Sequence, residues 1–119
     1  ILPGQTLEVC SSLPTASGVY NKLGNRRFLR IDLASAGTIT LVANLGATTG
    51  TAFSDPDLVL YSAGAERTRA ESSANATETL TQAGLAAGTY VLEVYEYSNV
   101  DPSVTARGNT CFNVQLTVS

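Results

Sequence analysis

The sequence contains no histidine, no tryptophan and no methionine, and it has a single lysine among its 119 residues. Without histidine, the chain cannot build a Ser-His-Asp or Cys-His catalytic group, nor the histidine-based sites of zinc hydrolases. Charged residues make up only 14% of the chain, which argues against a helical bundle with Glu- and Lys-rich exposed faces. We therefore expect a protein that is not an enzyme.

Long apolar runs are also missing: no stretch approaches the 18 residues that a membrane-spanning helix needs. The net charge is −3, and the one basic cluster, Arg26, Arg27 and Arg30, is interpreted as the solvated end of a strand. We expect neither a nucleic-acid nor a membrane partner. Because the chain starts at Ile1, we interpret it as a mature part or an excised domain of a longer exported protein.

What the sequence does have is β-strand patterning throughout. Its length and its 44% hydrophobic content predict one domain, residues 1–119, with its own core. Side chains alternate between apolar and polar, or are enriched in β-branched residues, in segment after segment. The predicted strands are residues 5–10, 27–33, 38–45, 58–62, 67–72, 78–81, 89–97 and 111–118.

These segments predict an all-β fold of about eight strands. Residues 27–33 and 38–45 flank the turn Ser35-Ala36-Gly37, so we expect them to form a hairpin. Residues 67–72 are polar throughout, which is typical of an edge strand. Sheets with one buried face pack as a sandwich or close into a barrel. We favour a jelly-roll-like antiparallel β-sandwich made of two Greek keys.

The two cysteines, Cys10 and Cys111, lie near opposite ends of the chain in predicted strands. Antiparallel first and last strands would bring them together in a disulfide that closes a loop of about 100 residues. Such a bond indicates an oxidising compartment, secreted or periplasmic. Two free buried thiols or half of a metal site are the alternatives, and the second is disfavoured because no third cysteine and no histidine complete it.

Four segments, taken in order, resemble the bacterial pre-peptidase C-terminal domains. They are Ile31-Asp-Leu-Ala-Ser-Ala-Gly-Thr-Ile-Thr-Leu41, Asp55-Pro-Asp-Leu-Val-Leu-Tyr61, residues 78–95 with Ala-Gly-Thr-Tyr, and Phe112-Asn-Val-Gln-Leu-Thr-Val118. The resemblance implies a jelly-roll accessory domain of a secreted peptidase, similar to collagen-binding domains. Some members bind collagen or other insoluble substrates, some bind calcium, and others are removed during maturation. The two cysteines depart from the commonest pattern of the family.

A pair of carboxylates two residues apart, Asp55 and Asp57, is the best candidate for metal binding. Hard oxygen ligands at the end of a loop suit calcium, which Asp101 or Asn99 from another loop could complete. The alternative is a turn in which the two aspartates cap the entry to the strand. We expect calcium to be the only cofactor, if there is one.

Three tyrosines, Tyr61, Tyr95 and Tyr97, are the best candidates for ligand binding. Alternation places Tyr95 and Tyr97 on the face opposite Leu92, where a tyrosine strip would offer flat apolar contacts and hydroxyl groups. The resemblance supports this reading, because collagen-binding members use such a sheet face. Alternatively, a loop covers the face, or the tyrosines only fill cross-strand pairs.

The favoured hypothesis is a non-catalytic accessory module of a secreted bacterial hydrolase that binds a polymer such as collagen or polysaccharide. Its partners would then be the catalytic domain of the parent protein and that insoluble substrate. A structural or maturation domain that aids folding or secretion is the second hypothesis. A calcium-dependent adhesion module is the third.

Overall fold

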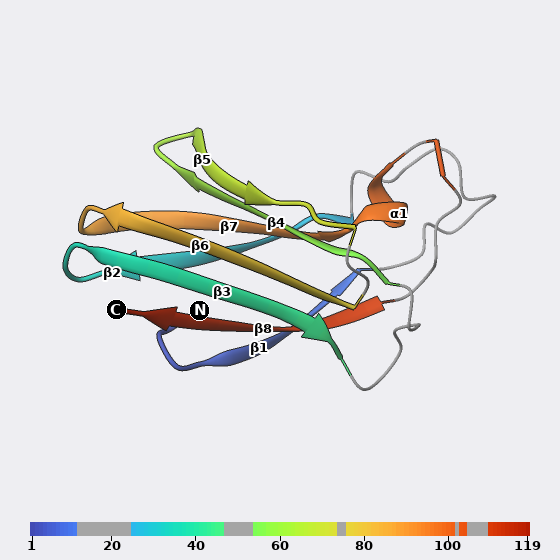
Figure 1. Ribbon diagram of the computed structural model, residues 1–119, viewed down its shortest axis with the longest axis horizontal. Coiled ribbons are helices and arrows are strands. Elements are labelled where there is room, and N and C mark those ends of the chain that lie inside the picture. The colour runs from blue at the N-terminus through green and yellow to red at the C-terminus, as the bar shows by residue number, and fades with distance from the viewer. Residues whose placement is uncertain (12–24, 47–53, 74–75, 102, 105–109) are drawn as a thin grey trace.

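The computed structural model describes residues 1–11, 25–46, 54–73, 76–101, 103–104 and 110–119 (Figure 1). This part of the chain contains eight β-strands and one short helix, α1. The elements are β1 (Thr6–Ser11), β2 (Arg27–Leu33), β3 (Gly37–Leu45), β4 (Pro56–Ser62), β5 (Ala65–Ala70), β6 (Thr77–Leu85), β7 (Gly88–Glu96), α1 (Tyr97–Val100) and β8 (Thr110–Val118).

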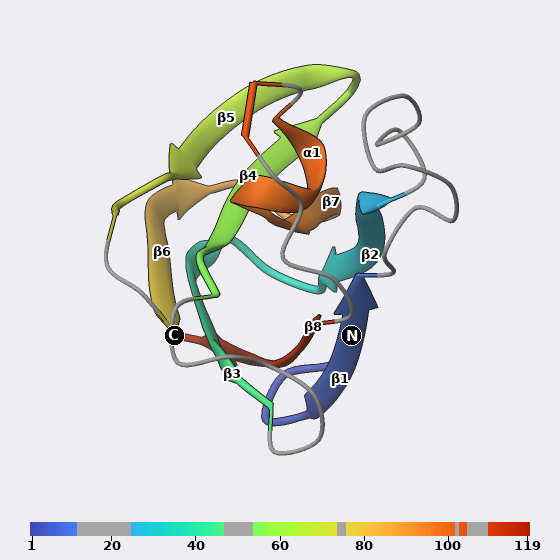
Figure 2. The same ribbon diagram turned by 90° about the vertical axis from the view of Figure 1, so that its right-hand side faces the viewer.

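The strands form two antiparallel sheets of four, in the orders β1-β8-β3-β6 and β2-β7-β4-β5. Strands of the first half of the chain thus alternate with strands of the second half in both sheets, which is the arrangement of a jelly roll. Viewed along the strands, the two sheets wrap around a common interior (Figure 2). The predicted all-β jelly-roll sandwich of about eight strands is confirmed.

The predicted hairpin between residues 27–33 and 38–45 is wrong. β2 pairs with β7, whereas β3 pairs with β6 and β8 in the other sheet. The short connection of residues 34–36 therefore crosses from one sheet to the other. Alternation correctly gave the buried face of each strand, but it carries no information about which strand lies beside it.

The strands other than β2 also differ from the predictions by one or more residues at their ends, and two of these differences affect the interpretation. β6 runs to Leu85 and is longer than residues 78–81, because the extension contains Ala83 and Gly84, residue types that are depleted in strands. β7 ends at Glu96, and Tyr97 begins α1 instead of continuing the strand. The polar segment predicted to lie at a sheet edge corresponds to β5, which is the edge of its sheet.

The core consists of the inward-facing side chains of both sheets, which pack against each other as in other sandwiches. It contains Val9, Ile31, Leu33, Ile39, Leu41, Ala43, Leu58, Leu60, Leu80, Leu85, Tyr90, Leu92, Val94, Phe112, Val114 and Leu116. In the described segments, no helix is long and apolar enough to cross a membrane.

The predicted disulfide between Cys10 and Cys111 is confirmed. The two residues stand directly opposite each other on β1 and β8, with their Cα atoms 4.0 Å apart, and the bond spans 101 residues of sequence. Next to it, the Gly46 N–H donates to the Cys111 carbonyl at 2.7 Å. A Cβ atom at Gly46 would lie 2.9 Å from that oxygen, so the approach of the two segments requires glycine.

Candidate functional site

The outer face of the β2-β7-β4-β5 sheet carries most of the predicted binding residues. The register places Tyr61 of β4 beside Val91 of β7, which in turn stands opposite Arg30 of β2. One step along the strands, Glu93 lies between Val59 of β4 and Phe28 of β2. Because side chains alternate along a strand, these residues share one face of the sheet.

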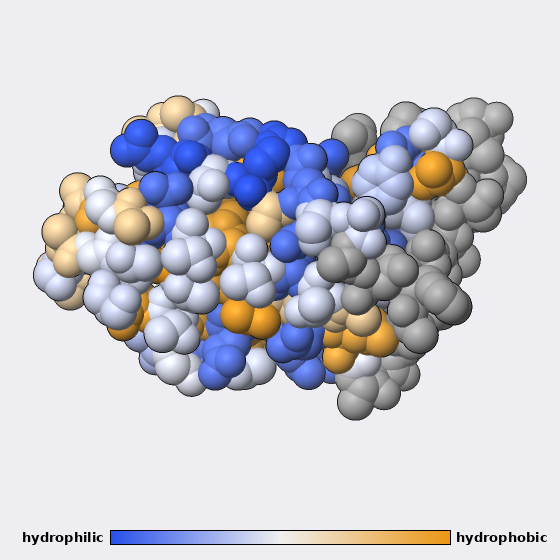
Figure 3. Space-filling model, in the orientation of Figure 1, coloured by the Kyte–Doolittle hydropathy of each residue, from blue (hydrophilic) through white to orange (hydrophobic). Residues whose placement is uncertain are grey.

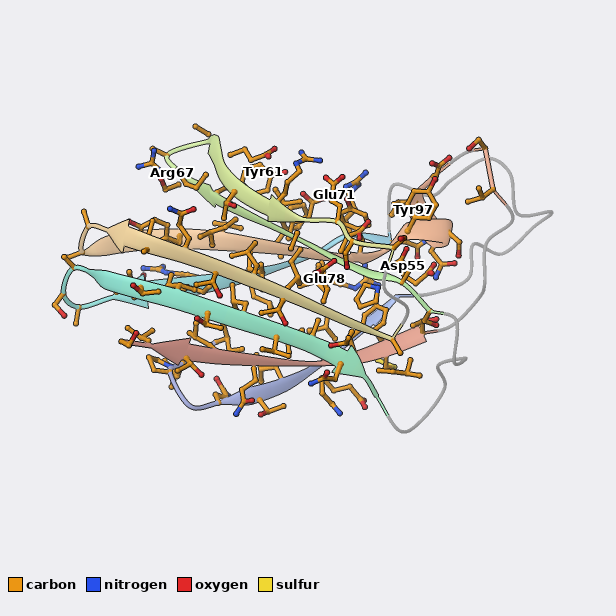
Figure 4. All side chains as sticks on the ribbon, viewed as in Figure 1. Asp55, Tyr61, Arg67, Glu71, Glu78 and Tyr97 are labelled. Carbon is orange, nitrogen blue, oxygen red and sulfur yellow. A yellow bond between two sulfur atoms is a disulfide. The ribbon has the colours of Figure 1, made fainter. Side chains whose placement is uncertain are left out.

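A groove of about 620 Å³ crosses this face at the end formed by the β4–β5 turn. Its lining is mostly apolar and consists of Phe28, Tyr61, Ser62, Ala63, Gly64, Thr89 and Val91. The Phe28 side chain is 61% exposed, which is unusual for so large an apolar group. Figure 4 labels Tyr61, which projects from β4 toward this outer surface.

A polar network fixes the tyrosine that lines the groove. The Tyr61 hydroxyl donates to Glu93 Oε2 at 2.7 Å, and Arg26 forms an ion pair with Glu93 Oε1. Glu93 is only 4% exposed, and the hydrogen bond to it raises the pKa of the Tyr61 hydroxyl. Arg26 also lies over the ring of Tyr95, 4.7 Å from its centre, in a cation–π contact.

The three tyrosines predicted to bind a ligand are not equivalent. Tyr61 lines the groove. Tyr95 is on the same sheet face, but it is buried, and burial together with the charge of Asp57 raises its pKa to about 12. Tyr97 is 41% exposed on α1, where a hydrogen bond with Asp101 raises its pKa. The structure therefore does not bring Tyr97 into one strip with Tyr61.

Phe28, a large and exposed residue of the groove, was not among the residues predicted to bind a ligand. The signal was present, because Leu29, Ile31 and Leu33 define the inner face of β2 and leave Phe28 on the outer face with the charged Arg30. A large aromatic residue on an otherwise polar strand face is a sign of binding, not of core packing.

Carboxyl groups gather at the other end of the sandwich, near α1. Asp57 is 4% exposed, and burial, reinforced by the nearby charges of Asp55 and Glu78, raises its pKa to about 7. A hydrogen bond with Tyr95 acts in the opposite direction. Figure 4 shows Asp55 and Glu78 at this end of the molecule, close to the helix.

Glu96 fixes the helix to the start of β4. Its Oε2 accepts hydrogen bonds from the Ser98 hydroxyl and from the Asn99 N–H at 2.9 Å, so Glu96 is the N-cap of α1. Its Oε1 accepts from the Asp55 N–H at 3.2 Å, and the Tyr97 N–H donates to the Asp55 carbonyl. These contacts stabilise the point where the chain leaves β7.

Asp55, Asp57 and Asp101, the three aspartates predicted to bind calcium, are not among the potential ligands that lie close together in the described residues. In the described ranges, the only three potential ligands whose atoms all lie within 4.8 Å of one another are Glu8, Cys10 and Cys111, and both cysteines are in the disulfide. Asp101 Oδ1 instead accepts from the N–H and hydroxyl of Ser103 at 2.7 and 2.6 Å. Calcium binding by Asp55, Asp57 and Asp101 stays a prediction.

No protein-family profile matches the sequence, and no curated protein matches it. The solved structures that share the fold include the following two. The pre-peptidase C-terminal domain of a collagenase from Bacillus anthracis has a TM-score of 0.62 at 15% identity, over 98% of this chain and 91% of that one. PliG from Aeromonas hydrophila, a periplasmic inhibitor of g-type lysozyme, has a TM-score of 0.57 at 14% identity, over 97% and 85%.

The chain therefore has the fold of a pre-peptidase C-terminal domain, as its sequence resemblance implied. At these identities the likeness concerns the fold alone. The disulfide fits a location in an oxidising compartment, outside the cytoplasm.

Proposed function

We propose that the chain is a non-catalytic accessory module of a secreted bacterial hydrolase, most simply a peptidase. It holds the enzyme on a polymeric substrate such as collagen, which docks along the outer face of the β2-β7-β4-β5 sheet. The parent catalytic domain is its covalent partner, and the polymer is its ligand.

The observation that carries this proposal is the groove between Phe28 and Tyr61. An exposed aromatic side chain is costly to keep in water unless a partner covers it, and aromatic residues dominate binding hot spots. Here Phe28 is solvent-exposed, while Tyr61 is already oriented by Glu93. Because the Tyr61 side chain is already ordered, less conformational entropy is lost when a ligand binds against it.

The shape of the surface favours an extended ligand with apolar side chains. The groove is open and mostly apolar, and the Tyr61 hydroxyl is engaged by Glu93. The surface thus offers stacking and apolar contact with few hydrogen bonds. A polypeptide fibre that repeats the same short apolar segment can present that segment many times, which compensates for a weak single contact.

The test is sedimentation of the purified chain with insoluble collagen fibres. We expect Phe28→Ala and Tyr61→Ala each to weaken binding at least tenfold, because each removes one wall of the groove. Leu2→Ala is the matched control, since Leu2 is also a large exposed apolar residue, 68% exposed, and it does not line the groove. Binding that is equally strong in all three variants would exclude the groove.

The structural or maturation role predicts a different result. Under that role the chain sediments with no fibre, and deleting it from the parent protein lowers the exported yield without changing substrate affinity. The calcium-dependent adhesion role predicts that EDTA lowers the melting temperature of the chain and that calcium restores it. An unchanged melting curve would exclude that third role.

A further inference from the structure

The outer face of the β1-β8-β3-β6 sheet has a composition unlike that of the groove. Its outward-facing side chains are almost all small or medium-sized, polar and uncharged. They include Thr6 and Glu8 of β1, Asn113, Gln115 and Thr117 of β8, Thr40, Val42 and Asn44 of β3, and Thr77, Thr79 and Thr81 of β6. Thr38 of β3 and Cys10 of β1, which forms the disulfide, lie on the same face. Each alternates with a residue that faces the core.

The strand register aligns these side chains in rows across the sheet. Thr81, Thr40 and Thr117 form one row over three strands. A second row contains Thr79, Val42, Gln115 and Thr6, and a third contains Thr77, Asn44, Asn113 and Glu8. Neighbours within a row are about 4.8 Å apart, and successive rows are about 6.7 Å apart, from strand geometry.

Hydrogen bonds within the rows hold the side chains in place. The hydroxyls of Thr40 and Thr81 lie 3.3 Å apart, and the Thr77 hydroxyl donates to Asn44 Oδ1 at 2.9 Å. β-branched threonines are also restricted in χ1. The surface therefore presents a regular, largely pre-ordered pattern of hydroxyl, amide and methyl groups.

Charge is distributed unequally between the two sheets. None of the four strands β1, β8, β3 and β6 contains a lysine or an arginine, whereas β2 and β5 of the other sheet carry Arg27, Arg30, Arg67 and Arg69. Figure 3 looks onto β3 and β6, which are largely pale, while strongly hydrophilic residues gather along β5 at the top. Such a surface has no counter-charge for a polyanion and, apart from Glu8, none for a polycation.

We infer that this face, defined by the rows above and called here the threonine face, binds the surface of an insoluble, neutral polysaccharide. Hydroxyl and amide groups both donate and accept hydrogen bonds, as sugar hydroxyls do. A neutral polymer also matches the absence of charge. This inference concerns the opposite sheet from the groove and does not depend on the proposed function.

The same chemistry predicts a preference for solid over soluble sugar. The described threonine face contains no aromatic residue on which a single sugar ring could stack. One oligosaccharide would make only a few hydrogen bonds in exchange for those with water, with little net gain. An ordered solid offers many such contacts at once, for one loss of translational freedom.

The test is depletion of the whole chain from solution by microcrystalline cellulose and by chitin, with insoluble collagen and soluble oligosaccharides of both polymers measured in parallel. We expect binding to at least one of the two solids and none to the oligosaccharides. The double variant Thr79→Lys with Thr117→Lys adds two charges to exposed positions of the face and is expected to weaken binding to the solid at least tenfold.

The control is Ser35→Lys with Ala86→Lys, which adds the same charge at exposed turns and should bind as the unmodified chain does. Thermal melting checks that both double variants are folded. Phe28→Ala should leave binding to the solid unchanged, which separates this face from the groove. The inference is overturned if the unmodified chain binds neither solid, if the threonine-face variant binds as well as the control, or if that variant loses binding to collagen instead.

Discussion

The hydroxyl of Tyr61 on β4 and the carboxylate of Glu93 on β7 are joined by a hydrogen bond of 2.7 Å beneath an exposed groove. Glu93 also pairs with Arg26, so that one buried carboxylate holds side chains from two directions. A buried acceptor that loses its partners costs more free energy than a typical hydrogen bond gains. The binding face and the stability of this sheet are therefore linked through Glu93.

Removing the Glu93 carboxylate should destabilise the fold more than removing the Tyr61 hydroxyl that donates to it. We expect Glu93→Ala to lower the free energy of unfolding by about 2–3 kcal/mol and Tyr61→Phe by about 1 kcal/mol, measured by urea denaturation. The control is Glu66→Gln, which removes an exposed carboxylate paired with Arg69 and should change stability by less than about 0.5 kcal/mol. Equal effects of Glu93→Ala and Glu66→Gln would contradict the role of Glu93.

The disulfide should account for a large part of the stability. Replacing both Cys10 and Cys111 by serine releases a loop whose closure is valued at roughly 2–5 kcal/mol of unfolding free energy. Urea denaturation of the double variant measures this loss. Dithiothreitol should lower the melting temperature of the unmodified chain and leave that of the double variant unchanged. An equal decrease in both melting temperatures would contradict the disulfide as the cause.

Stability should fall as the pH rises from about 4 to above 7. The pKa of Asp57 is raised to about 7 in the folded state, so the folded protein retains a proton that the unfolded chain releases near its ordinary pKa of 3.8. This contribution is complete below pH 3.8 and is lost as the pH passes through 7, with a slope of at most about 1.4 kcal/mol per pH unit.

The variant Asp57→Asn, which cannot ionise, should remove most of this dependence. Urea denaturation at pH 5 and pH 8 then gives nearly equal stabilities for the variant, and a lower stability at pH 8 for the unmodified chain. Asp32 is a useful contrast, because its hydrogen bonds with Thr89 and Arg30 lower its pKa, so its contribution is lost only in more acidic solution. An identical pH profile for Asp57→Asn would show that another group is responsible.

The turn between β4 and β5 can be improved. Ala63 and Gly64 both have positive φ, 50° and 74°, as a type I′ hairpin turn requires. Alanine is strained in this region and asparagine tolerates it, so we expect Ala63→Asn to stabilise the protein by about 1 kcal/mol. Gly64→Ala should destabilise it by about 1–2 kcal/mol. Thermal melting measures both effects, and a lower melting temperature for Ala63→Asn with a higher one for Gly64→Ala would exclude this turn type.

Much of the fold was predictable because a two-residue period reports burial directly. The range of β2 was predicted without error, and the cysteines were correctly paired because the first and last strands are neighbours. The neighbour of β2 was predicted wrongly, since nothing in residues 27–33 distinguishes pairing with β3 from pairing with β7, more than 50 residues away. Strand order is a property of the whole chain.

The candidate site was less predictable, for a related reason. Alternation placed Tyr95 on the outer face correctly. It could not show that Arg26, which directly precedes β2, lies over the Tyr95 ring. Tyr97 was predicted to lie in the same strip because the strand was expected to continue through it. The hydrogen bonds of Ser98 and Asn99 to Glu96, with which α1 begins, cannot be recognised from alternation. Contacts between side chains of distant segments decide which exposed positions are free to bind.

The covalent link between positions 10 and 111 has a mechanical consequence. A force that pulls Ile1 and Ser119 apart can extend only the short segments outside the bond, because the tension passes through the two sulfur atoms and bypasses the 101-residue span. The β2-β7-β4-β5 sheet lies inside the bypassed span and would keep its shape under load, whereas β1 before Cys10 and β8 after Cys111 would peel away from the other sheet.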